Sequence, residues 1–279
     1  MGNYQAESNF LKASDGIQIY WQGWFPQTPN SKTLVIAHGL GEHSGRYKNL
    51  VDYFVPLGYT IFAADHRGHG RSGGRRGHIN RFQEYYEDLH RVVQHVQKHQ
   101  PNSQLYLIGH SLGGLIAIHY ALNYPETLHG LIVSSPALQL KMKIPAVKAA
   151  LGKWLSAIWP TLAMANGIDI NDLSHDTDNV EQYRTDPLVH NRASTRYFTE
   201  FLDAMDAALA GAGNLKLPLL MLQAGADPII DPAGSQDFFN RVTLSDKELI
   251  IYDDFYHEIF NEVDRQRVLT DLEKWLEQH

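Results

Sequence analysis

The chain contains no cysteine among its 279 residues. Disulfide bonds and thiolate metal sites are therefore excluded, and cysteine usage does not indicate an oxidising or a reducing compartment. The sequence also has no His-Glu-x-x-His motif, and its 15 histidines are scattered. We interpret most of them as surface or loop residues and predict neither a metal site nor a cofactor.

Long apolar runs are missing as well. No window approaches the roughly 18 consecutive apolar residues of a membrane span. The first eight residues, Met1 to Ser8, show no basic stretch followed by an apolar run, which predicts no secretory leader. We therefore expect a cytoplasmic protein, with any membrane association at the periphery.

Positive charge is also scarce, because 24 Lys and Arg face 31 Asp and Glu, giving a net charge of −7. This balance argues against a nucleic-acid partner. Hydrophobic residues make up 43% of the chain and charged residues 20%, which is typical of a soluble globular protein. The length suits one large domain, or one domain with a sizeable insertion.

Strands and helices alternate along most of the sequence. A hairpin over 10–12 and 17–24 comes first, and buried strands are then predicted at 33–37, 59–64, 105–108, 130–134, 217–224 and 247–252. Helices are predicted at 47–55, 82–99, from 112 onward, around 238–239, and at 266–277. This alternation predicts an α/β fold with a mostly parallel sheet flanked by helices.

The alternation stops between residues 137 and 213. This part shows no clear buried strand, and it contains an apolar stretch over 144–162, a polar stretch over 171–186 and a predicted helix over 194–209. We interpret residues 137–213 as a helical cap inserted into a core formed by 1–136 and 214–279. Ten residues make the cap unusually apolar: Met142, Ile144, Val147, Leu151, Trp154, Leu155, Ile158, Trp159, Leu162 and Met164.

The strand over 105–108 leads into a glycine-rich turn and then into a helix. Gly109 and Gly113 flank Ser111 at two residues each, in the pattern G-x-S-x-G. A serine on a sharp strand-to-helix turn has a strained backbone, and glycines two residues away allow the close approach of main chains. The turn also places Ser111 at a helix N-terminus, where negative charge is stabilised. Ser111 is the candidate nucleophile.

A serine nucleophile needs a base and a carboxylate that orients the base. His257 follows the last predicted strand, and Asp227 follows the strand before it. The order Ser, Asp, His is that of the α/β-hydrolase architecture. Asp231 is a rival for the acid, and Asp253 and Asp254 lie near the base in sequence.

Acyl transfer also needs donors for an oxyanion. The backbone N–H groups of Leu112 and Leu40 are the candidates, since one follows the nucleophile and the other follows the His38–Gly39 strand exit. Another polar cluster, at residues 65–69, is expected to brace the loops beneath the site together with His38.

Three motifs resemble the monoacylglycerol lipase and lysophospholipase group of serine α/β-hydrolases. They are G-H-S-L-G at 109–113, A-H-G-L-G-E-H-S-G-R-Y at 37–47 and D-H-R-G-H-G-R-S at 65–72, and segments 173–176 and 183–189 also resemble that group's cap. The resemblance covers nearly the whole chain. It implies a triad of Ser111, Asp227 and His257, oxyanion donors at Leu40 and Leu112, and a cap over an acyl-chain tunnel that often touches membrane.

The resemblance predicts a carboxylic ester hydrolase acting on monoacylglycerols or lysophospholipids. We expect Trp154 and Trp159 of the cap to contact substrate near an entrance, or to lie at a bilayer interface. The chain departs from some relatives in lacking cysteines near the site, and its cap is least similar around 141–167. A small-ester esterase, a peptidase, a cofactor-free peroxidase and a non-catalytic binding protein stay open as alternatives, and so does the oligomeric state.

Overall fold

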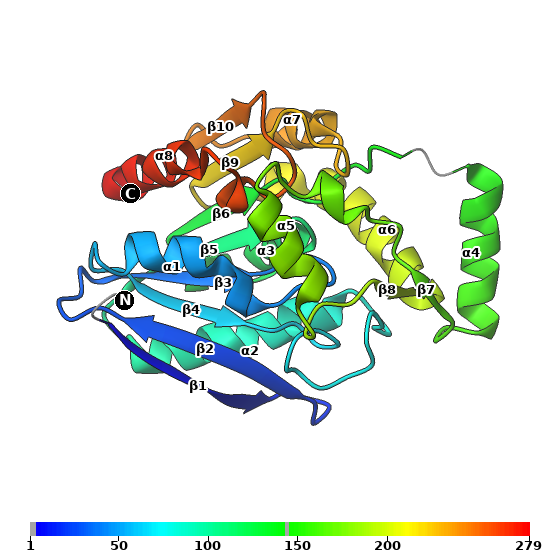
Figure 1. Cartoon of the computed structure of the whole chain (residues 1–279), viewed down its shortest axis with the longest axis horizontal. Coiled ribbons are helices and arrows are strands. Elements are labelled where there is room, and N and C mark those ends of the chain that lie inside the picture. Colours follow the sequence, from blue (N-terminus) through cyan, green and yellow to red (C-terminus); the bar gives the residue numbers. More distant parts are fainter. Residues whose placement is uncertain (1–3, 143–144) are drawn as a thin grey trace.

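A computed structural model describes residues 4–142 and 145–279, with the side chains of 146–149 left out of the description. The expectations for Ile144, for the side chain of Val147 and for the first three residues therefore lie outside the described residues. A single eight-stranded sheet forms the centre of the molecule, in the order β1-β2-β4-β3-β5-β6-β9-β10 (Figure 1). Its strands are β1 Gln5–Lys12, β2 Gln18–Phe25, β3 Lys32–Ala37, β4 Thr60–Ala64, β5 Gln104–His110, β6 Gly130–Ser134, β9 Leu219–Ala224 and β10 Lys247–Tyr252.

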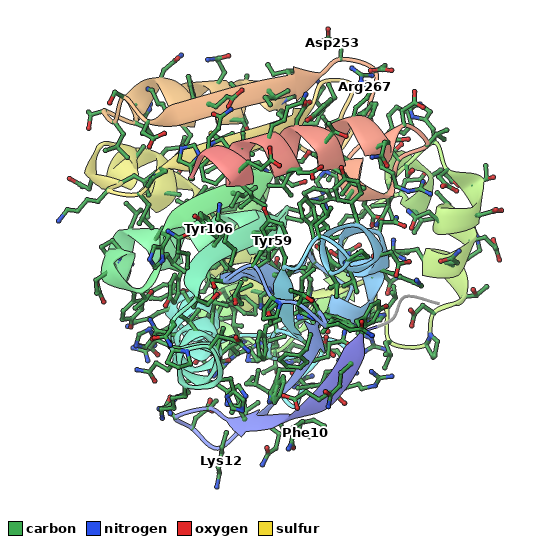
Figure 2. The ribbon with its side chains drawn as sticks, turned by 90° about the vertical axis from the view of Figure 1, so that its left-hand side faces the viewer. Phe10, Lys12, Tyr59, Tyr106, Asp253 and Arg267 are labelled. Carbon is green, nitrogen blue, oxygen red and sulfur yellow. The ribbon has the colours of Figure 1, made fainter. Side chains whose placement is uncertain are left out.

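Among the strands of this sheet in the described residues, β2 alone runs against the others. Strands β1 and β2 pair antiparallel, β2 pairs antiparallel with β4, and every pair from β4 to β10 is parallel. β1 is the outer edge strand, and Figure 2 shows its Phe10 and Lys12 pointing away from the sheet. The predicted mostly parallel α/β sheet is thus confirmed.

Helices cover both faces of the sheet. The core helices are α1 Lys48–Phe54, α2 Gln83–His99, α3 Leu112–Asn123, α7 Pro232–Arg241 and α8 Arg265–Gln278. Successive residues of β3 point to opposite faces: Leu34 and Ile36 pack with α1 and α8, whereas Val35 and Ala37 pack with α2 and α3. Because each parallel strand is buried on both faces, its sequence reads as a continuous apolar run.

Between β6 and β9 the chain leaves the sheet. This region contains α4 Ala146–Ile158, β7 Ala163–Ala165, α5 Thr177–Thr185, β8 Arg192–Ser194 and α6 Thr195–Gly211. Figure 1 shows α5 above the carboxyl ends of the central strands and α4 at the outer edge of the molecule. Helix α5 lies in the stretch that reads as merely polar, and the short β7–β8 ribbon was not predicted.

In the part of the chain that the structure describes, five short 3-10 segments join these elements. They are η1 Ser44–Tyr47, η2 Pro125–Thr127, η3 Ile170–Asp172, η4 Ala212–Asn214 and η5 Ile259–Asn261. Among the described residues, no helix combines the length and the apolar character needed to cross a bilayer.

Candidate active site

The turn from β5 into α3 holds Ser111 in a strained conformation. Its φ is 54° and its ψ is −118°, a positive-φ geometry that an L-residue rarely adopts. The flanking glycines explain how the turn is accommodated. A Cβ on Gly109 would lie 2.3 Å from the carbonyl oxygen of Gly113, and a Cβ on Gly113 would lie 2.0 Å from that of Ala37. Larger residues at either position would force the turn open.

Hydrogen bonds fix the main chain of Ser111. Its N–H donates to the carbonyl oxygen of Ser134 at 2.9 Å, and its carbonyl accepts from Leu115 at 3.1 Å and Ala137 at 3.0 Å. The conformation is therefore determined by β6 and α3 together, which is what a strained residue requires in order to persist. The serine is held at the carboxyl edge of the sheet, at the start of α3.

His257 and Asp227 come together at the same edge of the sheet. The Nδ1 atom of His257 lies 2.7 Å from Oδ2 of Asp227, and both side chains are buried. Oδ1 of Asp227 accepts from the N–H groups of Ile229 and Ile230, each at 2.9 Å. An ionised carboxylate only accepts hydrogen bonds, so Nδ1 of His257 is the donor and Nε2 is left for the nucleophile.

The pKa values of this pair move in opposite directions. Burial alone raises the pKa of Asp227, but the charge of His257, its hydrogen bond and the two backbone donors bring that pKa below its usual range. Burial lowers the pKa of His257, and the charge and hydrogen bond of Asp227 overcome this, so that the pKa lies above 6.5. The pair favours an imidazolium held by a carboxylate.

The rival carboxylates lie elsewhere. Asp231 caps the N-terminus of α7, where its side chain accepts from the N–H of Ala233. Asp254 pairs with Arg267 at 3.3 Å, and Asp253 is exposed beside it at the end of β10. Within the described residues, His257 is hydrogen-bonded to the carboxylate of Asp227 and to none of these three carboxylates.

A cavity of about 20 Å³ adjoins the nucleophile. Its lining combines Ser111 and His257 with the Gly39–Leu40 loop and with three residues of the 137–213 region, Ile168, Leu173 and Tyr183. This volume holds one or two water molecules, so an acyl chain does not fit in this conformation. Ser111 and His257 face the same space, but no hydrogen bond joins their side chains among those of the described residues. Such catalytic contacts often tighten only when substrate binds.

Two backbone N–H groups beside this cavity are available to an acceptor. Within the described part of the chain, neither the N–H of Leu40 nor that of Leu112 donates a hydrogen bond. Leu40 lines the cavity and Leu112 directly follows Ser111 at the first position of α3. Two such donors next to a serine hydroxyl suit a developing oxyanion.

A buried charge cluster not predicted from the sequence forms part of the cavity wall through Glu42 and Glu258. Arg46 donates to Glu258 at 2.6 Å and to Glu42 at 3.2 Å, while Glu42 accepts from the N–H of Gly39 at 2.6 Å. Asn179 of α5 donates to Glu258 at 2.9 Å. The cluster thus connects the Leu40 loop, the His257 loop and α5.

The two carboxylates of this cluster titrate differently. Burial raises the pKa of Glu258, but the charge of Arg46 and hydrogen bonds from Asn179 and Asn261 lower it to about 2. Burial and the neighbouring charge of Glu258 raise the pKa of Glu42. The guanidinium of Arg46 therefore contacts two carboxyl groups, and its contact with the ionised Glu258 is the shorter one.

The polar residues predicted to brace the loops are packed beneath the site. Nε2 of His38 accepts from the N–H of His66 at 2.9 Å, and Asp65 accepts from the N–H groups of Ser44 and Arg71 at 2.8 and 2.7 Å. Arg67 pairs with Asp88 at 2.6 Å. None of the brace residues, His38, Asp65, His66, Arg67 and His69, lines the cavity beside Ser111.

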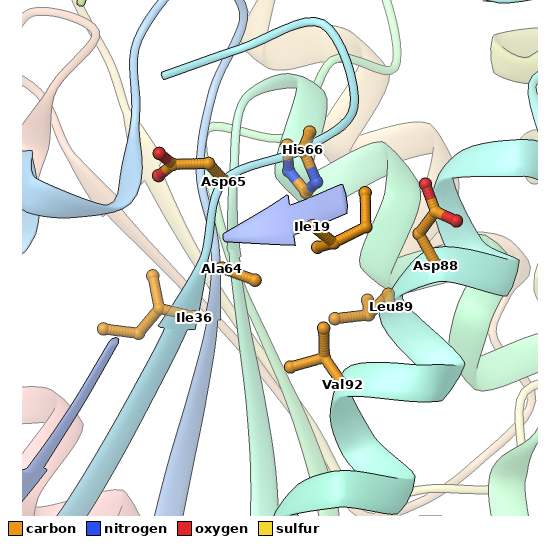
Figure 3. Close-up of a pocket in the computed structure, with 8 residues that line it drawn as sticks. All are labelled: Ile19, Ile36, Ala64, Asp65, His66, Asp88, Leu89 and Val92. Atoms are coloured by element: carbon orange, nitrogen blue, oxygen red, sulfur yellow. The ribbon is translucent and has the colours of Figure 1, made fainter. Parts of the chain in front are cut away.

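A second cavity lies between β4 and α2, on the other side of these residues. Figure 3 shows it enclosed by the apolar side chains of Ile19, Leu89 and Val92, with Asp88 at its rim. Its volume is about 10 Å³, enough for one water molecule. It is a packing defect of the core and lies outside the candidate active site.

Trp154 and Trp159 are not brought to the Ser111 cavity. Their side chains are 60% and 58% exposed, on and just after α4. Met142, Leu151, Ile158 and Met164 are also exposed. Helix α4 packs on α6 at the outer edge of the molecule (Figure 1), and the contact of these tryptophans with substrate stays a prediction.

Known proteins with similar sequences and structures are hydrolases. The sequence profile of the family described as serine aminopeptidase, S33, matches residues 28–264. A monoacylglycerol lipase of Mycolicibacterium smegmatis is 33% identical over 265 residues, which cover 95% of this chain and 94% of that protein. A phospholipase of Bacillus subtilis is 32% identical, covering 88% of this chain and 95% of its own length. The crystal structure of a monoacylglycerol lipase of Paleococcus ferrophilus superposes with a TM-score of 0.83 at 34% identity, covering 99% of this chain and 98% of that one.

Proposed function

Because the chain belongs to the serine aminopeptidase S33 family, whose fold is that of the α/β-hydrolases, we propose that it is a serine hydrolase that cleaves carboxylic esters of lipids. Monoacylglycerols and lysophospholipids are the proposed substrates. Support comes from the relatives, which include a monoacylglycerol lipase and a phospholipase. The single observation that carries the proposal is the buried Asp227–His257 pair beside the strained Ser111 turn.

In the proposed mechanism Ser111 is the nucleophile and His257 the general base. The hydroxyl of Ser111 attacks the ester carbonyl while Nε2 of His257 takes its proton, and Asp227 stabilises the resulting imidazolium. The N–H groups of Leu40 and Leu112 bind the oxyanion. His257 then donates the proton to the leaving glycerol oxygen, and a water molecule attacks the acyl-enzyme by the same route in reverse. No cofactor is needed for any of these steps.

We also propose that residues 137–213 form a cap that must shift before substrate enters. The Ser111 cavity is too small for an acyl chain, and its roof includes Ile168, Leu173 and Tyr183. The exposed apolar side chains of the cap, Trp154 and Trp159 among them, would contact a membrane surface transiently. Aromatic side chains are enriched at the interface between lipid and water, which fits this assignment.

The test is a panel of esters with increasing acyl length. Purified protein is given glycerol monoesters from acetyl to oleoyl, lysophosphatidylcholine and a peptide anilide, with Ser111→Ala as the control. We expect kcat/KM to rise by about fourfold for each methylene that the opened site buries. A preference for acetyl esters would instead identify a small-ester esterase. Faster cleavage of the anilide would identify a peptidase, and either result overturns the lipid assignment.

A further inference from the structure

One loop of this acidic protein carries a local excess of positive charge. Residues 71–81 contain four arginines and one histidine and no acidic residue, although the net charge of the chain is −7. The loop connects β4 to α2. Its concentration of arginines is not explained by the catalytic site, because none of residues 71–81 lines the Ser111 cavity.

The loop is packed onto the cap. The N–H of Ser194, in β8, donates to the carbonyl oxygen of Gly77 at 2.8 Å, and Nδ1 of His78 lies 2.8 Å from the hydroxyl of the same serine. A Cβ on Gly77 would come within 2.0 Å of the carbonyl oxygen of Arg192. The loop therefore lies against Arg192, the first residue of β8, at Gly77, which is two residues after Arg75.

Three of these guanidinium groups have no partner within the described residues. Arg75, Arg81 and Arg192 are exposed, and their side chains form neither an ion pair nor a hydrogen bond there. We call these three residues the basic patch. Arg76 is excluded, because its Nη2 donates to the carbonyl oxygen of Gly70, and Arg71 is excluded, because its guanidinium stacks on Tyr20.

Two carboxylates on the helices that follow the loop and β8, Glu84 of α2 and Glu200 of α6, have other partners. Glu84 lies 3.0 Å from Arg67, and it also accepts from the N–H of Asn80. Glu200 accepts from the N–H of Phe82. The positive charge of the basic patch is consequently left for an external anion.

Through Arg192, the basic patch adjoins an exposed apolar side chain of the cap. Arg192 pairs with Ala165 in the β7–β8 ribbon, and the preceding residue of β7, Met164, is 57% exposed. The hydroxyl of Thr195 donates to the carbonyl oxygen of Trp159 at 2.7 Å. Figure 1 shows the ribbon near one end of α4 with the 65–82 loop close to β8.

We propose that the basic patch docks the cap on a membrane surface that carries anionic lipids. Unpaired arginines beside exposed aromatic and apolar side chains match a negatively charged bilayer, where headgroups meet the cations and acyl chains meet the apolar residues. The inference rests on the proposed function, in which the substrate is drawn from a lipid surface. The basic patch would let the protein distinguish anionic from neutral membranes, which apolar side chains alone do not do.

The test compares vesicle binding of the full chain and two triple variants. Phosphatidylcholine vesicles, with and without a fraction of phosphatidylglycerol, are sedimented with wild type, with R75Q/R81Q/R192Q and with R241Q/R267Q/K274Q. The control triple lowers the net charge by the same three units on α7 and α8, where each cation faces a carboxylate. In Figure 1 both helices lie away from the β7–β8 ribbon.

We expect wild type to bind the anionic vesicles more tightly, and the binding to weaken with salt. The patch variant should lose affinity by about fivefold for each arginine removed, while the control variant keeps most of its affinity. Equal binding to both vesicle types, or equal losses in the two triple variants, overturns the inference. Hydrolysis of a short water-soluble ester, unchanged in all three proteins, shows that folding is intact.

The same samples distinguish this inference from the proposed function. Hydrolysis of dispersed monoacylglycerol without charge-dependent vesicle binding overturns the docking surface and leaves the lipase assignment intact. Charge-dependent binding by a protein that hydrolyses no lipid ester overturns the lipase assignment and leaves the docking surface intact.

Discussion

At the residue scale, the charge of Asp227 sets the protonation of His257. With Asp227→Asn, we expect kcat to fall by about 10⁴, because the imidazole loses the partner that fixes its tautomer. The wild-type base is inactive when protonated, so kcat/KM should fall as the pH drops through a midpoint above 6.5. In the variant, burial acts without the carboxylate, and the midpoint should move to lower pH.

The control for this prediction is Asp231→Asn, which changes the rival carboxylate at the cap of α7. It should leave the pH profile of kcat/KM unchanged. A normal profile in Asp227→Asn, or an equal loss in Asp231→Asn, would show that the acid has been assigned to the wrong residue.

Individual residues also mark where prediction from sequence stops. Asp227 could be preferred over Asp231 because chain order places the acid at the exit of the penultimate strand. The Arg46–Glu258 pair could not be predicted in this way, since its partners are 212 residues apart and only the folded chain brings them together. Charged side chains at such separation follow no periodicity.

At the scale of single elements, the turn between β5 and α3 depends on the absence of a side chain at residue 113. Gly113→Ala places a Cβ against the carbonyl oxygens of Ala37 and His38, so we expect a loss of about 1–3 kcal/mol in the free energy of unfolding, measured in urea. Activity should fall as well, because Ser111 and the N–H of Leu112 would move.

Gly152→Ala is the matched control within α4. Among the described side chains, its new Cβ would meet that of Phe198 alone, at 3.6 Å, and the helical backbone there suits alanine. We expect a gain of about 0.5–1 kcal/mol. Equal stability changes at the two positions would contradict the close approach of main chains at the nucleophile turn.

The helices and strands differ in how well they can be predicted from the sequence. The core strands were predictable because burial on both faces makes them short continuous apolar runs. Helix α5 was not, because only Val180 and Tyr183 of its nine residues are buried and the rest read as a polar loop. The three-residue strands β7 and β8 are too short to show alternation. They pair with each other, and β8 also bonds to Gly77 of the 65–82 loop.

At the scale of the whole molecule, the buried His66 and the half-buried His190 should make the fold sensitive to acid. Burial lowers the pKa of His66 to about 4, and burial together with Arg76 lowers that of His190 to about 4. The unfolded chain binds protons at these sites below about 6.5, whereas the folded chain does so only near 4. Stability should therefore be complete above pH 6.5 and decline as the pH falls toward 4.

Urea unfolding across this pH range measures the effect. His190→Gln should reduce the slope of stability against pH, because one of the contributing groups is gone. His99→Gln, which changes an exposed histidine of α2, serves as the control. A free energy of unfolding that stays constant between pH 6.5 and 4 would contradict the neutral state of His66 and His190 in the folded chain.

The account as a whole depends on a reactive hydroxyl at Ser111, and labelling with a fluorophosphonate followed by mass spectrometry of intact protein and peptides measures it most directly. We predict one label per chain, located on Ser111, with loss of monoacylglycerol hydrolysis in proportion to labelling and with no label on Ser111→Ala. A folded wild-type protein that resists the reagent, or that hydrolyses the ester equally well after Ser111→Ala, would contradict the account.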